Sequence, residues 1–527
     1  MNQINAGRYG LYLIAIVVVY GAMLLAKGGL YVTSHEGDAL HLIDIVLRMG
    51  QGQWPHLDFV TPLGVAAFLP IAAFVKAGFG VGMSILLAQI SVAIALILPV
   101  FYVATTRMTR NVGYVFGAVI LSMVMALVHG EIGQDVTSSM HYNRWAWALA
   151  FVAVPVAFFA PRDGGSAGID GLILGLAMSC LILGKVTFAV AFAPALALAL
   201  VLRKAWGAMG VAIGVVILCM AIPVGLAGFA FWQAYIGDLL EVAGSGIRPR
   251  AGVDWGTLLT GPRFVMANLV LLASIFVLRK GEKPELGLVL IVLAPGLLYV
   301  TYQNWGNDPK WLALLALILV MAGTSTKHAV LALAAAALIT PSFWNMGVSP
   351  LRHLKQGGDR FIAVFETEPH MDVFALKARV NRVIERGTVT YKAPQFLALN
   401  EFADIVEDVE FQGITYPSCQ QDTGVLGVLR EVAADLRDYG LGDDARIFVT
   451  DLFGSLWAFG GFVPLQGGTP WYYGELPGFE NSDYVLVPSC PITPPVFDAI
   501  IGKLNAMEGL ELEELRRTEL YTLYRKS

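Results

Sequence analysis

The sequence predicts a polytopic α-helical membrane protein that carries a soluble α/β domain at its C-terminal end. Of its 527 residues, 56% are hydrophobic and only 14% are charged, and the mean hydropathy is +0.65. A water-soluble chain of this length is not so apolar. The apolar runs end near residue 343, and a composition typical of soluble domains follows. The formal charge of −5 leaves no basic face to neutralise phosphates, which argues against a nucleic-acid partner.

The apolar runs divide into eleven predicted spans, several of them shorter than the roughly 20 residues that a span normally needs. The predicted spans are 11–32, 83–106, 113–129, 145–160, 169–184, 187–202, 208–231, 264–279, 286–302, 310–324 and 329–343. The apolar stretch 62–79 contains Pro62, Pro70 and several glycines. We expect this stretch to lie along the outer face as an interfacial or re-entrant helix, because a crossing there would reverse the side of every later loop.

With this assignment nine basic residues of the later loops fall on one side, which the positive-inside tendency makes the cytoplasmic side. These residues are Arg107, Arg110, Arg162, Arg203, Lys204, Arg279, Lys280, Lys283 and Lys327. An odd number of spans then places the C-terminal tail outside. The predicted domains are therefore a membrane domain, 1–343, with an outer loop at 33–82, and an extracytoplasmic domain, 344–527.

The tail alternates helix and strand signals, which is typical of a small α/β domain. Apolar residues at helical spacing predict helices at 424–439 and from Pro494 to Met507. Short apolar runs predict strands at 445–450, 484–487 and 518–525. Cys419 and Cys490 lie in this tail and can pair only if the tail is in an oxidising compartment.

The loop after the first span holds two carboxylates, Glu36 and Asp38, on either side of Gly37. Acidic groups so close to a membrane are costly unless they face water, a cation or a substrate. We expect Gly37 to let the backbone turn so that both carboxylates face one cavity, and Asp38 to cap the helix 39–49. A solvated loop is the alternative interpretation.

The predicted outer loops supply further candidates for substrate binding. These are His35, Asp58, Arg144, Lys185, Arg248, Arg250, Asn304, Asp308 and Lys310. The guanidinium and ammonium groups of the arginines and lysines in this set can pair with phosphate. Each of these cations alone is also typical of an anchor to lipid headgroups. His35, His41, His56 and His141 together with the carboxylates are an alternative set of ligands for a divalent metal. Their spacing matches no ligand motif, so the sequence predicts no definite cofactor and no assigned metal ligand.

Three features of the first loop and one later span carry a family resemblance. They are Glu36-Gly37-Asp38, the helix 39–49, the turn from Gly52 to Phe59 and the glycine-rich span from Gly171 to Lys185. Together they resemble the polyprenyl-phosphate-sugar-dependent membrane glycosyltransferases of the GT-C superfamily, which include protein mannosyltransferases and bacterial lipid A and polysaccharide sugar transferases.

The resemblance implies a GT-C-like fold in the bacterial inner membrane, with membrane lipid around it. It also implies a polyprenyl-phosphate sugar as donor and a glycan, lipid or protein as acceptor. Asp38 and Glu36 would be the catalytic pair. Many relatives carry Asp-Glu where this chain has His35-Glu36, so the identity of the base stays open.

Two other functions also fit an outward cavity lined with charges. A transporter or flippase of lipid-linked glycans is expected to bury ionisable groups in the middle of its spans and to show internal repeats. This chain instead gathers its charges at one face and carries a large soluble domain there, which favours an enzyme. A polymerase or ligase differs only in its acceptor and leaving group, and it remains an alternative.

Overall fold

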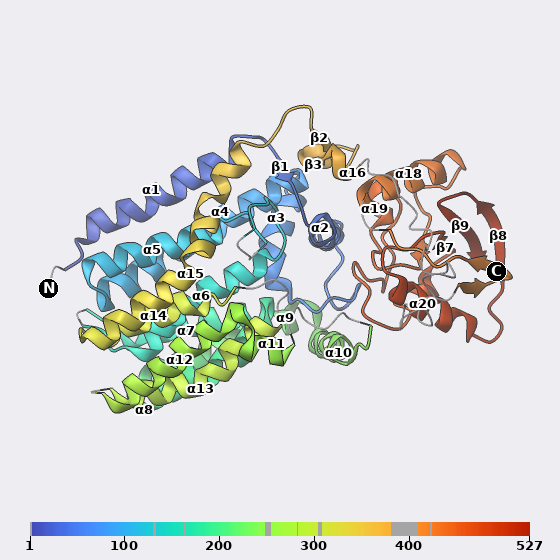
Figure 1. The fold of residues 1–527 in the computed structure, drawn as a ribbon. Helices are drawn as coiled ribbons and strands as arrows, with labels where there is room; N and C mark the ends of the chain where they lie inside the picture. The colour runs from blue at the N-terminus through green and yellow to red at the C-terminus, as the bar shows by residue number, and fades with distance from the viewer. Residues whose placement is uncertain are drawn as a thin grey trace.

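The computed structural model is elongated, with a helical bundle at one end and a smaller α/β domain at the other (Figure 1). It describes residues 3–129, 133–162, 164–247, 254–281, 283–303, 308–380, 408–421 and 424–526. The chain begins at the end of the bundle that lies far from the C-terminal domain.

Each of the eleven predicted spans corresponds to a helix of the bundle. The helices are α1 (Ala6–Leu25), α4 (Val81–Arg107), α5 (Arg110–Val124), α6 (His141–Phe158), α7 (Ala167–Gly184), α8 (Val186–Leu202), α9 (Trp206–Ala227), α12 (Pro262–Lys280), α13 (Pro284–Tyr302), α14 (Trp311–Ala322) and α15 (Thr326–Leu354). Within the described residues, seven helices are long and apolar enough to cross a membrane, namely α1, α4, α7, α9, α12, α13 and α15. The structure is therefore that of a membrane protein, and the count of eleven crossings stays a prediction.

The first predicted span is wrong at its outer end. Helix α1 ends at Leu25, and Gly28, at φ 66°, takes a left-handed conformation that ends the helical path. Residues Leu30–Val32 form strand β1, which pairs in parallel with β3 (Val373–Leu376). Strand β2 (Phe361–Ala363) completes this small sheet on the other side of β3. The sheet thus ties the start of the outer loop to the chain that follows the bundle.

The stretch 62–79 folds into a short 3₁₀ turn, η1 (Val65–Ala67), and the eight-residue helix α3 (Leu69–Lys76). A helix of this length is about 12 Å long, whereas the hydrocarbon core of a bilayer is about 30 Å thick. The length of α3 supports the prediction that this stretch does not cross the membrane.

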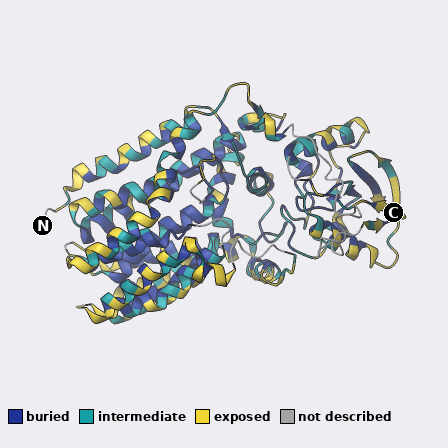
Figure 2. Ribbon diagram, viewed as in Figure 1, coloured by how far each residue is buried: buried dark blue, intermediate teal, exposed yellow. Residues whose placement is uncertain are grey.

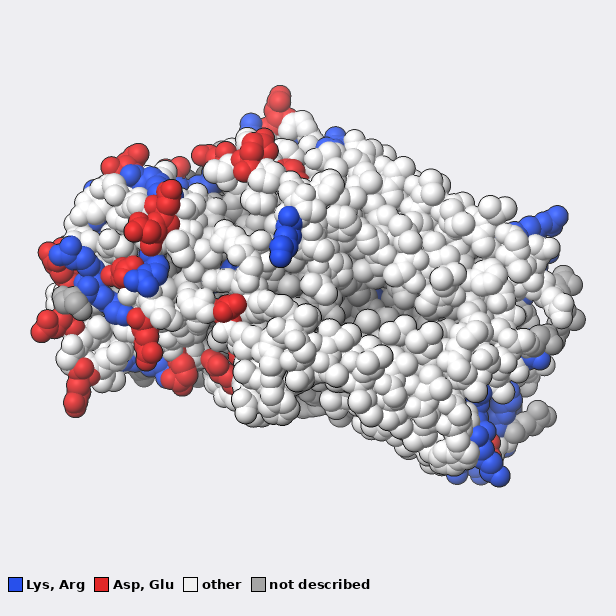
Figure 3. Space-filling view, turned by 180° about the vertical axis from the view of Figure 1, so that it is seen from behind, with Lys and Arg blue, Asp and Glu red and all other residues white. Residues whose placement is uncertain are grey.

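The charges gather at the two ends of the molecule. Figure 3 shows a belt almost bare of charged side chains between the C-terminal domain and the far end of the bundle. At the far end, Arg107 pairs with Asp170 at 2.5 Å, and Arg203 donates to the carbonyl oxygens of Val156 and Ala157. The predicted inner loops are therefore neighbours in space. Many residues on the bundle surface between the ends are exposed (Figure 2), and α9 is the least buried of the seven long apolar helices, as expected for a surface that faces lipid.

The C-terminal domain contains a four-stranded sheet in the order β6-β7-β9-β8, formed by Ile447–Val449, Tyr484–Pro488, Tyr521–Lys526 and Leu512–Arg517. Helices α18 (Val425–Asp438) and α20 (Pro494–Asn505) confirm the predicted helices, and β6, β7 and β9 confirm the predicted strands. A hairpin of β4 (Val409–Phe411) and β5 (Ile414–Tyr416) precedes α18. A disulfide joins Cys419 to Cys490. Shorter helices are α10 (Ala230–Gly244), α11 (Trp255–Thr260), α16 (Lys377–Val380) and α19 (Leu456–Gly460).

Helix α2 (Glu36–Gly50) lies between the bundle and the C-terminal domain (Figure 1). Its buried Arg48 pairs with Asp44 at 2.6 Å and donates to the carbonyl oxygen of Leu465 at 2.9 Å. The indole of Trp457 donates to the same Asp44 carboxylate at 3.2 Å. These buried polar contacts cross the junction, so α2 holds the C-terminal domain against the end of the bundle that lies away from the N-terminus.

Candidate functional site

The two carboxylates of the first loop both lie in the first turn of α2. The helix begins at Glu36 and is preceded by His35, whose φ of 60° is left-handed. The expectation that Asp38 caps a helix starting at residue 39 is therefore wrong, because the helix begins three residues earlier. The expected turn at Gly37 is also wrong, since Gly37 is helical. A Cβ atom at Gly37 would lie 2.8 Å from the ring of Phe453, so glycine here allows close packing of the C-terminal domain.

Glu36 is engaged by an arginine from the far end of the chain. Arg379, on α16, donates from Nε to one carboxylate oxygen and from Nη2 to the other, the second at 2.9 Å. The Glu36 side chain is 8% exposed. A bidentate guanidinium pair holds a carboxylate in one orientation, so Glu36 has the character of a positioning group.

Asp38 has a different environment, although only one residue separates it from Glu36. Its side chain is 30% exposed. The hydroxyl of Ser139 donates to Asp38 Oδ2 at 2.9 Å, and His129 Nδ1 lies 3.6 Å from the same oxygen. No arginine or lysine is paired with Asp38 in the part of the chain that the structure describes. Asp38 is therefore the more accessible carboxylate of the two and is free to accept a proton or to bind a cation.

Two histidines flank Asp38. The rings of His35 and His129 stack with centroids 4.1 Å apart, and ligand atoms of His35, Asp38 and His129 all lie within 4.8 Å of one another. Two imidazoles and one carboxylate with open positions fit a borderline divalent metal such as Zn²⁺. Of the four histidines considered from the sequence, this group includes His35 alone. His56 instead bonds to Asp238 at 2.8 Å, and His141 Nε2 donates to the carbonyl oxygen of Ala67 at 2.7 Å.

A large apolar groove of about 810 Å³ runs along α4, α6 and α7 and is closed at its outer end by η1. Leu98, Leu172 and Leu176 in its wall are exposed at the bundle surface, so the groove opens sideways toward lipid. Lys185 stands at the outer end, with its ammonium 5.2 Å from the ring centroid of Tyr142. Among the described residues that line the groove, Lys185 is the one charged side chain.

One end of the groove is connected to Asp38 through the start of α6. Ser139, which donates to Asp38, lies in the turn before α6, and Tyr142, three residues later, lines the groove beside Lys185. His41 lies one turn along α2 from Asp38, and the charges of Asp38 and Lys185 both affect its pKa. Burial lowers the pKa of His41 to about 4, Asp38 and Asp44 oppose this shift, and Lys185 adds to it. His41 is therefore neutral at pH 7.

The other predicted binding residues lie in varied surroundings. Arg144 is buried and donates to the carbonyl oxygens of Val128 and Ser139, close to the Asp38 cluster. Asp58 accepts from the Trp54 amide at 2.6 Å and from Gln466 at 2.8 Å, so it shapes the loop rather than meeting Asp38. Asp308 pairs with Arg263 at 2.5 Å, and Lys310 is buried. Arg248, Arg250 and Asn304 lie outside the described residues.

Sequence reasoning missed the groups that surround the carboxylates, namely His129, Ser139, Arg379 and Phe453. His129 had a signal, because it is a histidine at the outer end of a predicted span. Nothing in the sequence indicated Arg379 or Phe453, because each lies more than 300 residues along the chain from Glu36.

These observations define a helical membrane protein whose carboxylate cluster lies between an apolar, laterally open groove and a C-terminal α/β domain. No protein-family model matches the sequence, and no curated protein matches it. Among solved structures, the chain is similar to the oligosaccharyltransferase of Archaeoglobus fulgidus in complex with Zn and sulfate, with a TM-score of 0.34 and 10% identity. The match covers 90% of this chain and 68% of that chain. A likeness of this degree does not define a family, so the function is argued from the site.

Proposed function

We propose that this protein is a membrane glycosyltransferase that moves a sugar from a polyprenyl-phosphate donor to a glycan, lipid or protein acceptor at the outer face of the membrane. The observation that carries the proposal is the position of Asp38. This accessible carboxylate bonds to Ser139, three residues before Tyr142 of the wall of an apolar groove that ends at Lys185, and both Asp38 and Lys185 act on the same neighbour, His41.

The groove fits the lipid part of such a donor. Its wall is almost wholly apolar, so it can bury an isoprenoid chain with a gain of about 25 cal/mol for each Å² of apolar surface removed from water. A phosphate at the head of that chain would meet the ammonium of Lys185 and lie close to α2. Arg144 is a second cation near this end, since its guanidinium bonds to the same Ser139 segment that contacts Asp38.

Asp38 would act as the general base. Its carboxylate takes the proton from an acceptor hydroxyl, the hydroxyl oxygen forms a bond to the anomeric carbon, and the bond from that carbon to the phosphate oxygen breaks. The electron pair leaves with the lipid phosphate, and attack from the opposite face inverts the anomeric centre. Ser139 orients the Asp38 carboxylate through its hydrogen bond, and Glu36, held by Arg379, orients the acceptor side.

The donor set at Asp38 also fits a divalent cation, with His35, Asp38 and His129 as its ligands. Such a cation, when bound, would stabilise the negative charge of the departing phosphate. Asp38 would then serve as a metal ligand, while Ser139 would still orient its carboxylate and Lys185 would still face the lipid head.

The rival function, transport of a lipid-linked glycan, needs a polar path through the membrane. The groove is instead apolar along its length, and Lys185 lies at its outer end. This arrangement holds a lipid at the outer face better than it guides a polar head group across the bilayer. A polymerase or ligase remains an alternative, because it would use the same groove and carboxylate with another leaving group.

The test is release of undecaprenyl phosphate from a panel of undecaprenyl-phosphate hexoses and pentoses, in membranes that contain matched amounts of protein. We expect Asp38→Asn to lower the rate by about 10²–10⁴-fold, the usual effect of losing a general base, and Glu36→Gln to reduce it strongly. Glu513→Gln removes an exposed carboxylate of the C-terminal domain and is the matched control. Near-wild-type turnover in both the Asp38 and the Glu36 variants would refute the assignment.

A further inference from the structure

A second cavity, which shares no lining residue with the groove, lies between the start of α2 and the C-terminal domain. This α2–α18 cavity has a volume of about 410 Å³ and is formed by two distant parts of the chain. Ser34, His35, Glu36 and Gly37 contribute one wall, and the C-terminal domain contributes the other. Its volume is in the range of about 300–1,000 Å³ that is typical of ligand pockets.

The α2–α18 cavity adjoins the Asp38 cluster directly. The ring of His35 lines the cavity and also stacks on His129, beside Asp38. On the groove side, Tyr142 of the groove wall lies three residues after Ser139, whose hydroxyl donates to Asp38. The groove and the cavity therefore approach Asp38 through different neighbours, Ser139 and His35, which is the arrangement that a two-substrate transfer requires.

The charges of the cavity cancel. Glu36 and Arg379 are the charged residues that line it in the part of the chain described, and they neutralise each other in a bidentate pair. An anionic ligand would have to compete with Glu36 for Arg379, and a cationic ligand would have to compete with Arg379 for Glu36. The cavity thus favours an uncharged ligand.

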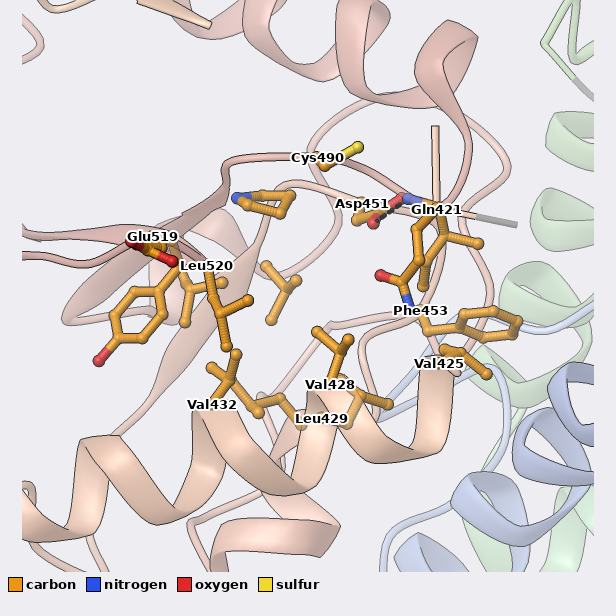
Figure 4. A pocket seen from close by; sticks show the side chains of 16 residues that line it. Gln421, Val425, Val428, Leu429, Val432, Asp451, Phe453, Cys490, Glu519 and Leu520 are labelled. Atoms are coloured by element: carbon orange, nitrogen blue, oxygen red, sulfur yellow. Dashed lines mark hydrogen bonds between the residues drawn. The ribbon is translucent and has the colours of Figure 1, made fainter. Parts of the chain in front are cut away.

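The rest of the wall has the amphipathic character of a sugar site. The ring of Phe453 and the side chains of Val425, Leu426 and Ile492 offer apolar surface, whereas Ser34, His35 and Gln421 carry hydrogen-bonding groups. Figure 4 shows a neighbouring pocket of the C-terminal domain that shares Gln421, Val425 and Phe453 with this wall; Val425 and Phe453 lie there near one end of the helix α18. An aromatic face with a few polar groups matches a pyranose, which has an apolar C–H face and a polar hydroxyl rim.

We infer that the α2–α18 cavity binds the acceptor, and that the acceptor is an uncharged glycosyl unit with a free hydroxyl directed toward Asp38. The inference rests on the proposed transferase function and adds the class of its second substrate. Phe453 supplies the surface for the sugar ring, and the Glu36–Arg379 pair fixes the wall of the cavity and excludes anionic glycans.

The experiment measures saturation-transfer NMR of sugars added to the purified full chain in detergent, without any donor. The probes are methyl α-D-glucopyranoside, methyl α-D-mannopyranoside and N-acetylglucosamine, with glucuronic acid as the anionic comparison. We expect saturable binding of at least one neutral sugar, at least tenfold weaker binding of glucuronic acid, and unchanged binding to the surface variant Glu513→Gln. Val425→Phe fills the cavity and should weaken binding at least tenfold, whereas Ala434→Phe, at an exposed position of α18, should not.

The outcomes separate this inference from the proposed function. Neutral-sugar binding that Val425→Phe abolishes supports the cavity assignment even if no donor is ever turned over. Any one of three results would overturn it. They are a preference for glucuronic acid, equal sugar binding by Val425→Phe and the Ala434→Phe control, and no saturable binding of any sugar. An active transferase whose KM for its acceptor is unchanged by Val425→Phe would also overturn it, and the transferase assignment would stand.

Discussion

Glu36 and Asp38 show how two neighbouring carboxylates acquire different roles from their partners. Glu36 is buried and held by both arms of the Arg379 guanidinium. Asp38 is more exposed, accepts a hydrogen bond from Ser139 and has two imidazoles at its side. The sequence shows two acids one residue apart, and only their contacts distinguish a positioning group from a candidate base.

A third carboxylate, Asp451, stabilises the C-terminal wall of the α2–α18 cavity. It accepts hydrogen bonds from the amides of Leu452 and Ile492 at 2.7 Å each and from that of Thr493 at 3.3 Å. Leu452 and Ile492 line the cavity. Burial raises the pKa of Asp451 from 3.8 to about 6, although the three amides oppose the shift.

We predict that this burial makes stability depend on pH. Because the folded-state pKa of Asp451 is raised, its contribution is fully present below about pH 4 and is lost as the pH rises through about 6. A rise in pKa from 3.8 to about 6 corresponds to about 3 kcal/mol at most. The measurement is the Tm of the full chain between pH 4 and 7, for wild type and for Asp451→Asn. The difference between the two Tm values should change over this window. A constant difference would contradict the prediction.

At the scale of elements, α2 is the helix around which the site forms. Its polar face meets the C-terminal domain through Asp44 and Arg48. His41 lies against Trp471 with ring centroids 5.5 Å apart, and Trp471 in turn meets Phe453 at 5.0 Å. These aromatic contacts continue to the first turn of α2, where Gly37 leaves room for the Phe453 ring.

We predict that Gly37→Ala destabilises this junction. The added Cβ would lie 2.8 Å from Phe453 Cζ, and overpacking of this kind costs about 1–3 kcal/mol. The measurement is the Tm of the purified protein, with Gly210→Ala as control because nothing lies within 4 Å of a Cβ at that helical glycine. Phe453→Leu removes the clashing atom, so the double variant should lose less than the sum of the single variants. Additive losses would show that the two residues do not meet.

At the scale of the whole molecule, charge is distributed along the long axis. The basic residues of the predicted inner loops lie at the end where the chain begins, and the C-terminal domain lies at the opposite end (Figures 1 and 3). Between the two ends is the apolar belt. If the belt lies in the bilayer, the positive-inside tendency places the C-terminal domain outside the cytoplasm, where Cys419 and Cys490 can remain paired.

This arrangement predicts the behaviour of reporters fused after the last residue, Ser527. Alkaline phosphatase, which needs an oxidising compartment, should be active there, and a fluorescent protein that matures only in the cytoplasm should be dark. A second pair of fusions after Arg203, in a predicted inner loop, should give the reverse pattern and serves as the control. Cytoplasmic fluorescence from the C-terminal fusion would place both the domain and the Asp38 cluster on the other side.

The sequence by itself determined the class of protein, the positions of the bundle helices and the α/β character of the tail. These features follow from local composition and periodicity, since the spacing of apolar residues over a short stretch shows which face of a helix or strand is buried. The sequence also located Glu36 and Asp38, because acidic residues beside an apolar span are conspicuous. It misjudged the end of the first span and the role of Gly37, since both depend on partners near residues 373 and 453.

Only the tertiary structure decided which groups meet at the site. Ser139 lies 101 residues from Asp38 along the chain, and Arg379 lies 343 residues from Glu36. The groove is likewise assembled from η1, α4, α6 and α7, and the α2–α18 cavity from the two ends of the chain. No local pattern encodes such pairings, because they result from how helices and domains pack to bury their surfaces. The sequence therefore identified the carboxylates, and packing gave each of them its partners.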